Sequence, residues 1–240
     1  MLRTLLLVLP FTLVAALLGL VVMIPVTWVV RDIGPIYAVA RAVLRMAFRL
    51  AGVRIETHGA DPWSTPQPCV FVANHASNLD PPLVFVCLPR VAIMGKAIVF
   101  RWPLFGYALK MAEFIPVDRG RAESRRRALE AGADRLKRGI SLALFPEGTR
   151  SPDGNLLPFR PGAFSMAIEA QAPVVPITIV GGREVMAKGH PWIRPGLLKL
   201  LFHPPVPTRG LGPADRAELV GRVREAIASA LPLSPTARSS

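Results

Sequence analysis

The feature that most constrains this chain is a run of 27 residues, Thr4 to Val30, in which no side chain is charged. As one helix, this run would be about 40 Å long, whereas the hydrocarbon core of a bilayer is ~30 Å thick. A cleaved signal peptide would be shorter and would end at a small-x-small site before a polar segment, and no such site follows the run. Pro10 and Pro25 are tolerated in a spanning helix but also suit a broken helix in the interface. The sequence therefore predicts that residues 1–52 attach the chain to a membrane, either by spanning it or by lying flat in it.

The arginines around this run are unevenly distributed. Arg3 alone precedes it, whereas Arg31, Arg41, Arg45 and Arg49 follow it. Because segments rich in Lys and Arg stay on the cytoplasmic side of a membrane, we expect the main body of the chain at the cytoplasmic face of the cell inner membrane.

The segment after the run, "PIYAVARAVLRMAFRLAG" (residues 35–52), has the pattern of an amphipathic helix. Arginines lie on one side of it, and the other side carries Val39, Val43, Met46, Ala47 and Leu50. Such a helix suits a membrane surface, but a core helix has the same pattern. Its position directly after an uncharged run favours the membrane.

Beyond Gly52, short apolar segments of strand length alternate with helical patterns. The expected strands are Val53–His58, Cys69–Ala73, Val91–Met94, Phe114–Val117, Ser141–Phe145, Pro173–Val180 and Leu197–Phe202. The clearest expected helices are Ala122–Arg138 and Ala214–Ala230. This alternation predicts one layered α/β domain over residues 53–232, in which helices flank a mostly parallel or mixed sheet of about seven strands. Residues 233–240, "LSPTARSS", are expected to form a disordered tail.

The chain is strongly basic, with 29 Lys and Arg residues against 16 Asp and Glu residues and a formal net charge of +13. Such a protein is expected to bind polyanions: nucleic acid, anionic lipid or phosphorylated small molecules. The arginines of residues 119–138 alternate with apolar residues at helical spacing, and no base-reading module is recognisable, so we expect no nucleic-acid partner. Anionic membrane lipids and a phosphorylated substrate explain the same charge. Cys69 and Cys87 form neither a disulfide framework nor a metal-binding pattern, and no metal site is expected.

One histidine and one aspartate stand five positions apart in the stretch "VFVANHASNLDPPL" (residues 70–83). His75 ends a buried strand, a place where functional side chains often gather. Asp80 precedes two prolines, so a purely structural role as the N-cap of a helix is open to it. Across a turn the two side chains can converge. The carboxylate would then bind the Nδ1 hydrogen of the imidazole and leave the other nitrogen as a general base.

A covalent enzyme intermediate is not indicated by this stretch. Ser77 lies inside the turn, but the G-x-S-x-G pattern of a nucleophilic serine is absent, and so is a reactive-cysteine signature. We therefore expect an alcohol of the substrate to be the nucleophile, activated by His75.

Two more polar turns follow apolar strands. In "FPEGTRS", Gly148 allows the backbone to approach a ligand closely, and Arg150 offers donors that suit a phosphate monoester. The P-loop pattern is absent, so nucleotide hydrolysis is not expected. The second turn, "FIPVDRG", contains Arg119. Because sites in α/β sheets assemble at strand ends, these turns are expected to lie near His75.

Taken together and in this order, these motifs resemble the 1-acyl-sn-glycerol-3-phosphate acyltransferase family, the lysophosphatidic acid acyltransferases. "NHASNLD" is similar to the family's N-H-x-x-x-x-D motif, "FIPVDR" to its second block, "FPEGTRS" to its third, and "VVPITI", with Pro176, to its fourth. "GKAIVFRWPLFG" (residues 95–106) resembles the lysine-containing stretch of the family, and the whole resemblance covers residues 53–188. Pro116, inside the second block, departs from an ordinary strand and suits a strand end or an edge strand.

The resemblance implies a glycerol-3-phosphate acyltransferase-like fold and a membrane-associated enzyme. It implies that a fatty acyl group moves from acyl-CoA or acyl-carrier protein to the sn-2 hydroxyl of 1-acyl-sn-glycerol 3-phosphate, a lysophospholipid, to give phosphatidic acid. His75 would be the general base, Asp80 would orient it, and neither a metal nor another cofactor would be needed. The residues implied to bind the phosphate of the acceptor are Lys96, Arg119, Glu147, Gly148, Thr149 and Arg150.

Other activities stay open. Relatives acylate other lyso-lipids, including lyso-ornithine lipid. An acyl thioesterase would use water as the acceptor, but it would not need the second and third polar turns. A non-catalytic membrane-binding module would leave His75 and Asp80 unexplained.

Replacing the histidine tests the chemical role of the turn. We expect His75→Ala to abolish acyl transfer, because no other group in the motif would take the proton from the alcohol. Membrane attachment and the far-ultraviolet circular dichroism spectrum should stay as in the wild type. Transfer from a radiolabelled acyl donor is the measurement, and a variant that retains transfer would remove the histidine from the reaction.

Overall fold

The computed structural model describes residues 2–61, 64, 68–118 and 120–232. Two predictions therefore lie outside the described residues, namely the phosphate-binding role of Arg119 and the disordered tail at residues 233–240. The other segments predicted as strands and helices can be compared with the structure directly.

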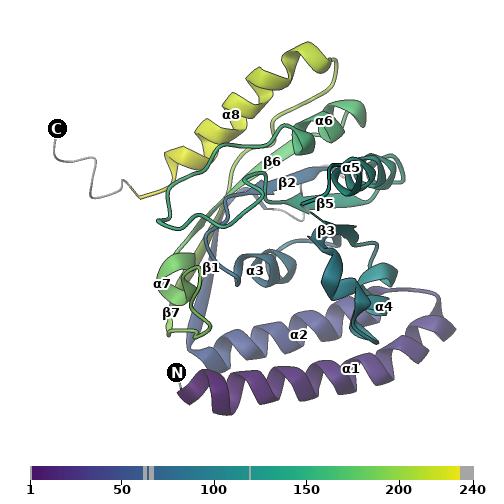
Figure 1. The fold of residues 1–240 in the computed structure, drawn as a ribbon, viewed down its shortest axis with the longest axis vertical. Coiled ribbons are helices and arrows are strands. Elements are labelled where there is room, and N and C mark those ends of the chain that lie inside the picture. Colours follow the sequence, from purple (N-terminus) through teal and green to yellow (C-terminus); the bar gives the residue numbers. More distant parts are fainter. Residues whose placement is uncertain (1, 62–63, 65–67, 119, 233–240) are drawn as a thin grey trace.

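Seven strands pair into one sheet with the order β1-β7-β6-β2-β5-β3-β4 (Figure 1). Their bounds are β1 Val53–Gly59, β2 Val70–Ala73, β3 Val91–Lys96, β4 Ile115–Val117, β5 Ser141–Leu144, β6 Val174–Val180 and β7 Gly196–Phe202. Neighbouring strands run parallel, except that β6 and β7 are antiparallel. The predicted mixed α/β sheet is thus confirmed. Pro116 lies in the edge strand β4, where a missing backbone N–H is tolerated.

Helices cover both faces of the sheet (Figure 1). The α-helices are α1 Leu9–Val30, which continues the π-helical turn η1 Thr4–Val8, α2 Gly34–Ala51, α3 Asp80–Cys87, α4 Phe105–Met111, α5 Ala122–Lys137, α6 Gly162–Glu169, α7 Gly182–Met186 and α8 Arg216–Ser229. Two 3-10 segments, η2 Ala97–Arg101 and η3 Pro213–Asp215, complete the described elements. Figure 1 shows α1, α2 and α3 on one side of the sheet and α5, α6 and α8 on the other.

The central strands are buried on both faces, which is why their sequences are continuous apolar runs rather than alternating ones. Successive side chains of β2 point to opposite faces. Val70 and Val72 belong to the core under α5, α6 and α8, whereas Phe71 and Ala73 belong to the core under α2 and α3. The two cores together fix β2, which leads directly to His75.

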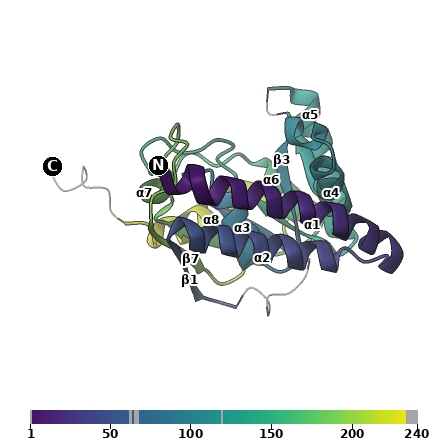
Figure 2. The ribbon, with the colours of Figure 1, turned by 90° about the horizontal axis from the view of Figure 1, so that it is seen from below.

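The uncharged run forms one long helical segment with its apolar side chains exposed. Thr4–Val30 is long and apolar enough to cross a membrane, and only 6% of its most apolar window is buried. The helix lies beside α2 (Figures 1 and 2), and Gly19 faces Val39 so closely that a Cβ there would be 3.0 Å from Val39 Cγ1. Thr4 Oγ1 exchanges hydrogen bonds with the backbone of Ile193 at one end, and Trp28 Nε1 donates to the Tyr107 hydroxyl at the other. Both ends of the segment are therefore held against the domain.

Helix α2 turns two of its three arginines, Arg41 and Arg45, toward α3, which sequence alone did not predict. Arg41 donates to the backbone oxygens of Phe85 (3.3 Å) and Leu88 (2.6 Å), and Arg45 donates to that of Val86. These oxygens belong to the end of α3, where carbonyl groups have no partner within the helix. Ala47, Phe48 and Ala51 of α2 lie in the core beside β1 and β2. The helix is thus part of the packed domain as well as the neighbour of α1.

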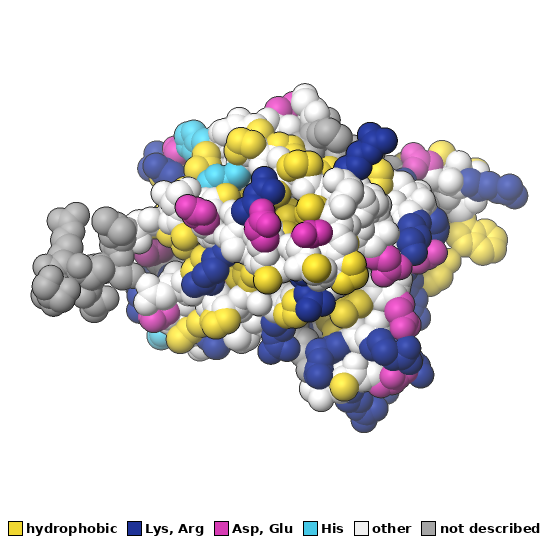
Figure 3. Space-filling model, turned by 90° about the horizontal axis from the view of Figure 1, so that it is seen from above, with side chains coloured by type: hydrophobic (Ala, Val, Ile, Leu, Met, Phe, Trp, Pro, Cys, Tyr) yellow, Lys and Arg dark blue, Asp and Glu magenta, His cyan; other side chains and the backbone are white. Residues whose placement is uncertain are grey.

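The face of the molecule opposite α1 carries charged side chains of both signs between apolar ones (Figure 3). Lys and Arg side chains gather over the projection formed by α5, at the lower right of this view. Two of these arginines are paired on their own helix: Arg126 with Glu123 and Glu130, and Arg127 with Glu123. These pairs are exposed to solvent, which screens them, so they contribute little to the stability of the helix.

Arg41 and Arg49 of α2 offer a matched pair for testing the contact with α3. Arg41→Ala leaves the carbonyls of Phe85 and Leu88 without their donor, and we expect the free energy of unfolding to fall by about 1–3 kcal/mol. Arg49 is exposed and has no hydrogen bond or ion pair with another described side chain. Its replacement by Ala should change the same quantity by less than about 0.5 kcal/mol. Urea unfolding in detergent measures both, and equal effects would show that the contact contributes nothing.

Candidate active site

The polar turns predicted to form the site meet at one edge of the sheet. Strands β6, β2, β5, β3 and β4 all run in the same direction, so their carboxyl ends lie together. Beyond these ends follow the turn with His75 after β2, the "FPEGTRS" turn after β5, Lys96 at the end of β3 and α7 after β6. Polar groups from distant parts of the sequence thus lie along one edge of the sheet, where the sites of α/β proteins assemble.

His75 and Asp80 converge across the turn, as predicted. The imidazole Nδ1 lies 2.8 Å from Asp80 Oδ2. The same oxygen accepts the backbone N–H groups of Ala76 (2.8 Å) and Ser77 (2.7 Å). Asp80 is fully buried and His75 nearly so. Three donors therefore offset the cost of placing this carboxylate away from water.

The alternative role that the sequence left open for Asp80, as the N-cap of α3, is not the one that the structure shows. Asp80 is the first residue of the helix, Leu79 precedes it, and no side-chain cap bond is present. The physical reason lies in the next two residues, because Pro81 and Pro82 have no backbone N–H for a cap to accept. The first backbone donor of the helix, Leu83 N–H, is already bound by the Leu79 carbonyl (2.9 Å). The carboxylate is free to point back into the turn.

The second oxygen of this carboxylate, Asp80 Oδ1, is buried and has no hydrogen-bond partner among the described residues. It lies against Gly182, the first residue of α7, where a Cβ would come within 2.9 Å of it. No other residue type fits at position 182 without displacing the carboxylate or the helix.

His75 is also held through its backbone and its ring face. Its N–H donates to Glu147 Oε1 (2.8 Å), and its carbonyl accepts the N–H of Ser151 (2.7 Å). The imidazole stacks on the ring of Phe145 with centroids 4.4 Å apart. Its Nε2 atom has no hydrogen-bond partner among the described residues. The ring is thus fixed on three sides, with Nε2 left for a ligand.

Both carboxylate oxygens of Glu147 accept hydrogen bonds from backbone N–H groups of the protein. It is only 4% exposed, and its second oxygen accepts the N–H of Leu157 (3.2 Å). Burial raises the pKa of this carboxyl to about 7, although the hydrogen bonds from the His75 and Leu157 backbones oppose the shift. Both oxygens are engaged, so the geometry gives no support to the expectation that Glu147 contacts a phosphate.

Asn74, just before His75, closes the end of β2 onto β6. Its side-chain Nδ2 donates to the Ile179 carbonyl (2.9 Å), and its Oδ1 accepts the Ile179 N–H (2.7 Å). This paired contact imitates a strand ladder after β2 itself has ended. It fixes the position of the His75 backbone relative to the sheet.

The remaining described residues that were predicted to bind the phosphate lie on the same edge, on the turn after β5 and at the end of β3. Arg150 is partly buried, and its Nη1 atom is buried without a partner among the described residues. Gly148 has a φ of +72°, and a Cβ on it would lie 2.6 Å from Arg160 Nε. Thr149 and Lys96 are exposed. Arg160, a cation beside the same turn, was not predicted.

Several contacts around the site were not predicted, although their residues stand in the quoted motifs "NHASNLD" and "FPEGTRS". Asn74 bonds to β6, the Ser151 N–H donates to the His75 carbonyl, and Phe145 stacks on the imidazole. Such contacts between distant segments follow no local pattern. Arg160 could have been noticed as the next arginine after the "FPEGTRS" turn. Ser77 is buried and its hydroxyl donates to the Met186 carbonyl (2.8 Å), which agrees with the expectation that it is not a nucleophile.

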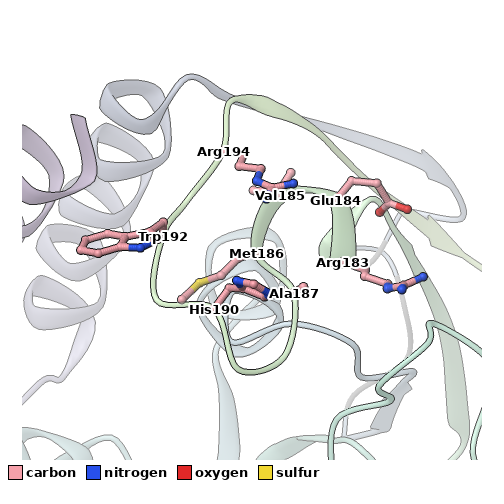
Figure 4. A pocket seen from close by; sticks show the side chains of 8 residues that line it. All are labelled: Arg183, Glu184, Val185, Met186, Ala187, His190, Trp192 and Arg194. Carbon is pink, nitrogen blue, oxygen red and sulfur yellow. The ribbon is translucent and has the colours of Figure 1, made fainter. Parts of the chain in front are cut away.

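A cavity of about 280 Å³ lies beside the site, on α7 and the loop after it (Figure 4). Its wall includes Met186, whose carbonyl accepts the Ser77 hydroxyl, and also Trp192, which points toward the N-terminal helices. Arg183 and Arg194 line it together with one carboxylate, Glu184. None of the predicted site residues lines this cavity.

Comparison with known proteins identifies related chains. A model of the Acyltransferase family matches residues 54–180, just over half of the chain. The 1-acyl-sn-glycerol-3-phosphate acyltransferase alpha of Homo sapiens is 35% identical over 180 residues, which cover 74% of this chain and 64% of that protein. That of Mus musculus is 33% identical over 192 residues, which cover 79% of this chain and 67% of that protein. The match thus spans a little less than two thirds of the human protein.

A solved structure has the same fold over nearly the whole chain. The crystal structure of the 1-acyl-sn-glycerophosphate (LPA) acyltransferase PlsC from Thermotoga maritima superposes with a TM-score of 0.81 at 25% sequence identity. The superposition covers 97% of this chain and 98% of that one. It therefore includes the N-terminal helices as well as the sheet.

The raised pKa of Glu147 predicts a pH dependence of stability. The ordinary pKa of 4.5 applies in the unfolded chain, and about 7 applies in the folded one, so the folded protein binds this proton more tightly. The contribution of the group to stability is complete below pH 4.5 and is lost as the pH rises to about 7. Compared with Glu147→Gln, which cannot titrate, the wild type should lose stability over this window.

Urea unfolding at several pH values measures this difference. Glu225→Gln, at an exposed position on α8, controls for the loss of a surface carboxylate. A constant difference between the wild type and Glu147→Gln across the window would mean that the Glu147 carboxyl titrates alike in both states.

Proposed function

The chain belongs to the acyltransferase family, and from this premise we propose that it moves a fatty acyl group from an acyl thioester to the sn-2 hydroxyl of 1-acyl-sn-glycerol 3-phosphate. The product would be phosphatidic acid. The observation that carries the proposal is the His75–Asp80 pair, with Nδ1 held at 2.8 Å and Nε2 open at the edge where the polar turns meet. The related proteins from Homo sapiens and Mus musculus bear the name of this activity, which supports the choice of acceptor.

The reaction follows from the geometry of the pair. Nε2 of His75 takes the proton of the acceptor hydroxyl while its oxygen attacks the thioester carbonyl, and Asp80 stabilises the imidazolium that forms. When the tetrahedral intermediate collapses, the carbon–sulfur bond breaks and the imidazolium returns its proton to the departing thiolate. One ester and one thiol result, and neither a covalent enzyme intermediate nor a cofactor is required. Acyl-CoA and acyl-carrier protein both supply such a thioester.

The phosphate of the acceptor would bind at the cationic side of the same edge. Arg150 is the first candidate, because its buried Nη1 donor has no partner within the described residues, and an anion would satisfy it. Gly148 and Thr149 would offer backbone and hydroxyl donors, and Lys96 a second charge from the end of β3. Arg119 would belong to this group by its place in the motif.

Glu147 would act as a positioning residue rather than as a contact to the phosphate. Its carboxylate joins the His75 backbone to the Leu157 backbone and so fixes the histidine relative to the loop after β5. A carboxylate facing a phosphate would repel it, whereas a carboxylate that accepts two backbone N–H groups holds the turn in place.

The N-terminal segment would lie in the plane of the membrane surface. Thr4 is bonded to Ile193 and Trp28 to Tyr107, so both ends of the 27-residue helix are held on one side of the domain. A helix that crosses the bilayer would have to release one of these ends. Anionic lipids would attract the basic domain to the same surface, at the cytoplasmic face of the inner membrane by the distribution of its arginines.

A panel of acceptors tests this function. Transfer from radiolabelled acyl-CoA should proceed to lysophosphatidic acid, and not to glycerol 3-phosphate, lyso-ornithine lipid or water. Arg150→Ala should raise the KM for lysophosphatidic acid roughly tenfold or more, as the loss of a charge-assisted hydrogen bond implies, with kcat little changed. Arg222→Ala, on the exposed side of α8, is the control. Preferential use of lyso-ornithine lipid, or of water, would replace the proposed acceptor.

A further inference from the structure

Five exposed apolar side chains gather on a short segment outside the N-terminal helices. Apart from these helices, the large hydrophobic side chains that are exposed within the described residues all belong to η2, α4 and the turn between them. We call the set the aromatic patch: Ile98, Trp102, Leu104, Phe105 and Tyr107, which are 40–56% exposed. A patch of this kind on a folded domain marks a surface that meets a partner.

The backbone holds these side chains outward. Leu104, at the tip, has a φ of +57°, a conformation that costs free energy for any residue with a side chain. Gly106 passes so close to the buried Phe100 that a Cβ there would lie 2.2 Å from the Phe100 oxygen. Its N–H donates to the Trp102 carbonyl (2.8 Å). Buried Phe100 and the close approach of Gly106 thus fix the path of the backbone on either side of the tip.

The patch continues the apolar surface of α1. Trp28, near the end of α1, donates its indole N–H to the Tyr107 hydroxyl (3.1 Å). Figures 1 and 2, which view the molecule from perpendicular directions, both place α4 beside the C-terminal half of α1. The two apolar surfaces thus adjoin one another at the same side of the molecule, away from the charged face of Figure 3.

The charges around the patch identify the partner. Lys96, Arg101 and Lys110 are exposed in this segment, and residues 91–112 contain no Asp or Glu. Trp and Tyr side chains flanked by Lys and Arg are typical of the boundary between the head groups and the acyl chains of a membrane. A second copy of the chain is a poorer partner, because a two-fold contact would bring the same cations face to face.

We propose that the aromatic patch inserts into the interfacial layer of an anionic bilayer and forms a second membrane contact of the domain, in addition to α1. The segment begins at Lys96, on the sheet edge that carries His75, so this contact would hold the site at the lipid surface. That consequence rests on the proposed function, whereas the contact itself is tested without acyl donor or acceptor.

Site-specific quenching tests the contact in the full chain. A fluorophore is attached to Phe105→Cys in the patch, to Leu17→Cys on α1 and to Ala228→Cys on the exposed side of α8, each in a separate protein. The native cysteines interfere little at neutral pH, because Cys69 is fully buried and burial raises the pKa of the Cys87 thiol to about 11. Each protein is reconstituted in vesicles of phosphatidylethanolamine and phosphatidylglycerol.

We expect lipids with a quencher on the acyl chain to reduce emission from positions 105 and 17 severalfold more than from position 228. Aqueous iodide should do the reverse. Position 98, labelled through Ile98→Cys, repeats the test if the label at position 105 prevents folding.

If lipid quenchers leave the emission from position 105 unchanged, the proposal is overturned, whatever the result at position 17. If iodide also fails to quench position 105, the patch is covered by protein, and a second copy of the chain is its partner instead.

Discussion

Asp80 Oδ2 is the atom on which the turn of residues 75–80 depends. A carboxylate with no access to water is stable only when donors surround it, and here the imidazole and two consecutive backbone N–H groups do so. These bonds curl residues 75–80 into the shape that brings the histidine and the aspartate together. The interaction that makes the turn stable is therefore the same one that orients the ring.

The sheet supplies the accuracy that a turn alone would lack. Asn74 ties the turn to β6, and Glu147 and Ser151 tie it to the loop after β5, so both neighbours of β2 determine where His75 lies. Each of these hydrogen bonds joins residues that are more than seventy positions apart in the sequence. Phe145, which stacks on the imidazole, directly follows β5. A small displacement of either neighbouring strand would therefore change the position of the imidazole.

Much of the fold could be predicted because the decisive signals are local. The central strands are apolar on both faces and end at Gly, Pro or polar residues, so their number and order of appearance follow from the sequence. The approach of His75 and Asp80 also follows, because their spacing suits a turn. The alternative role of Asp80 as a helix cap is not adopted, because a cap accepts backbone N–H groups that Pro81 and Pro82 lack.

What the sequence could not predict are directions and long-range partners. A helical pattern shows that Arg41 and Arg45 share a side of α2, but not that this side meets the free carbonyls of α3. The hydrogen bonds of the Glu147 carboxylate could not be predicted either, because the motif contains the residue but does not indicate which backbone N–H groups donate to it. The aromatic patch depends on a strained turn that no apolar pattern encodes.

Asp80 Oδ1 lies against Gly182 and has no hydrogen-bond partner in the part of the chain that the structure describes, which has a consequence for how this protein could change over time. A buried charge with an unsatisfied oxygen costs folding free energy, and a neutral side chain of similar size would cost less. Selection for thermal tolerance alone would thus favour loss of the carboxylate. Under the proposed function, the carboxylate at position 80 costs stability and supports the reaction, so a search for more stable variants should keep Asp80 and change other positions.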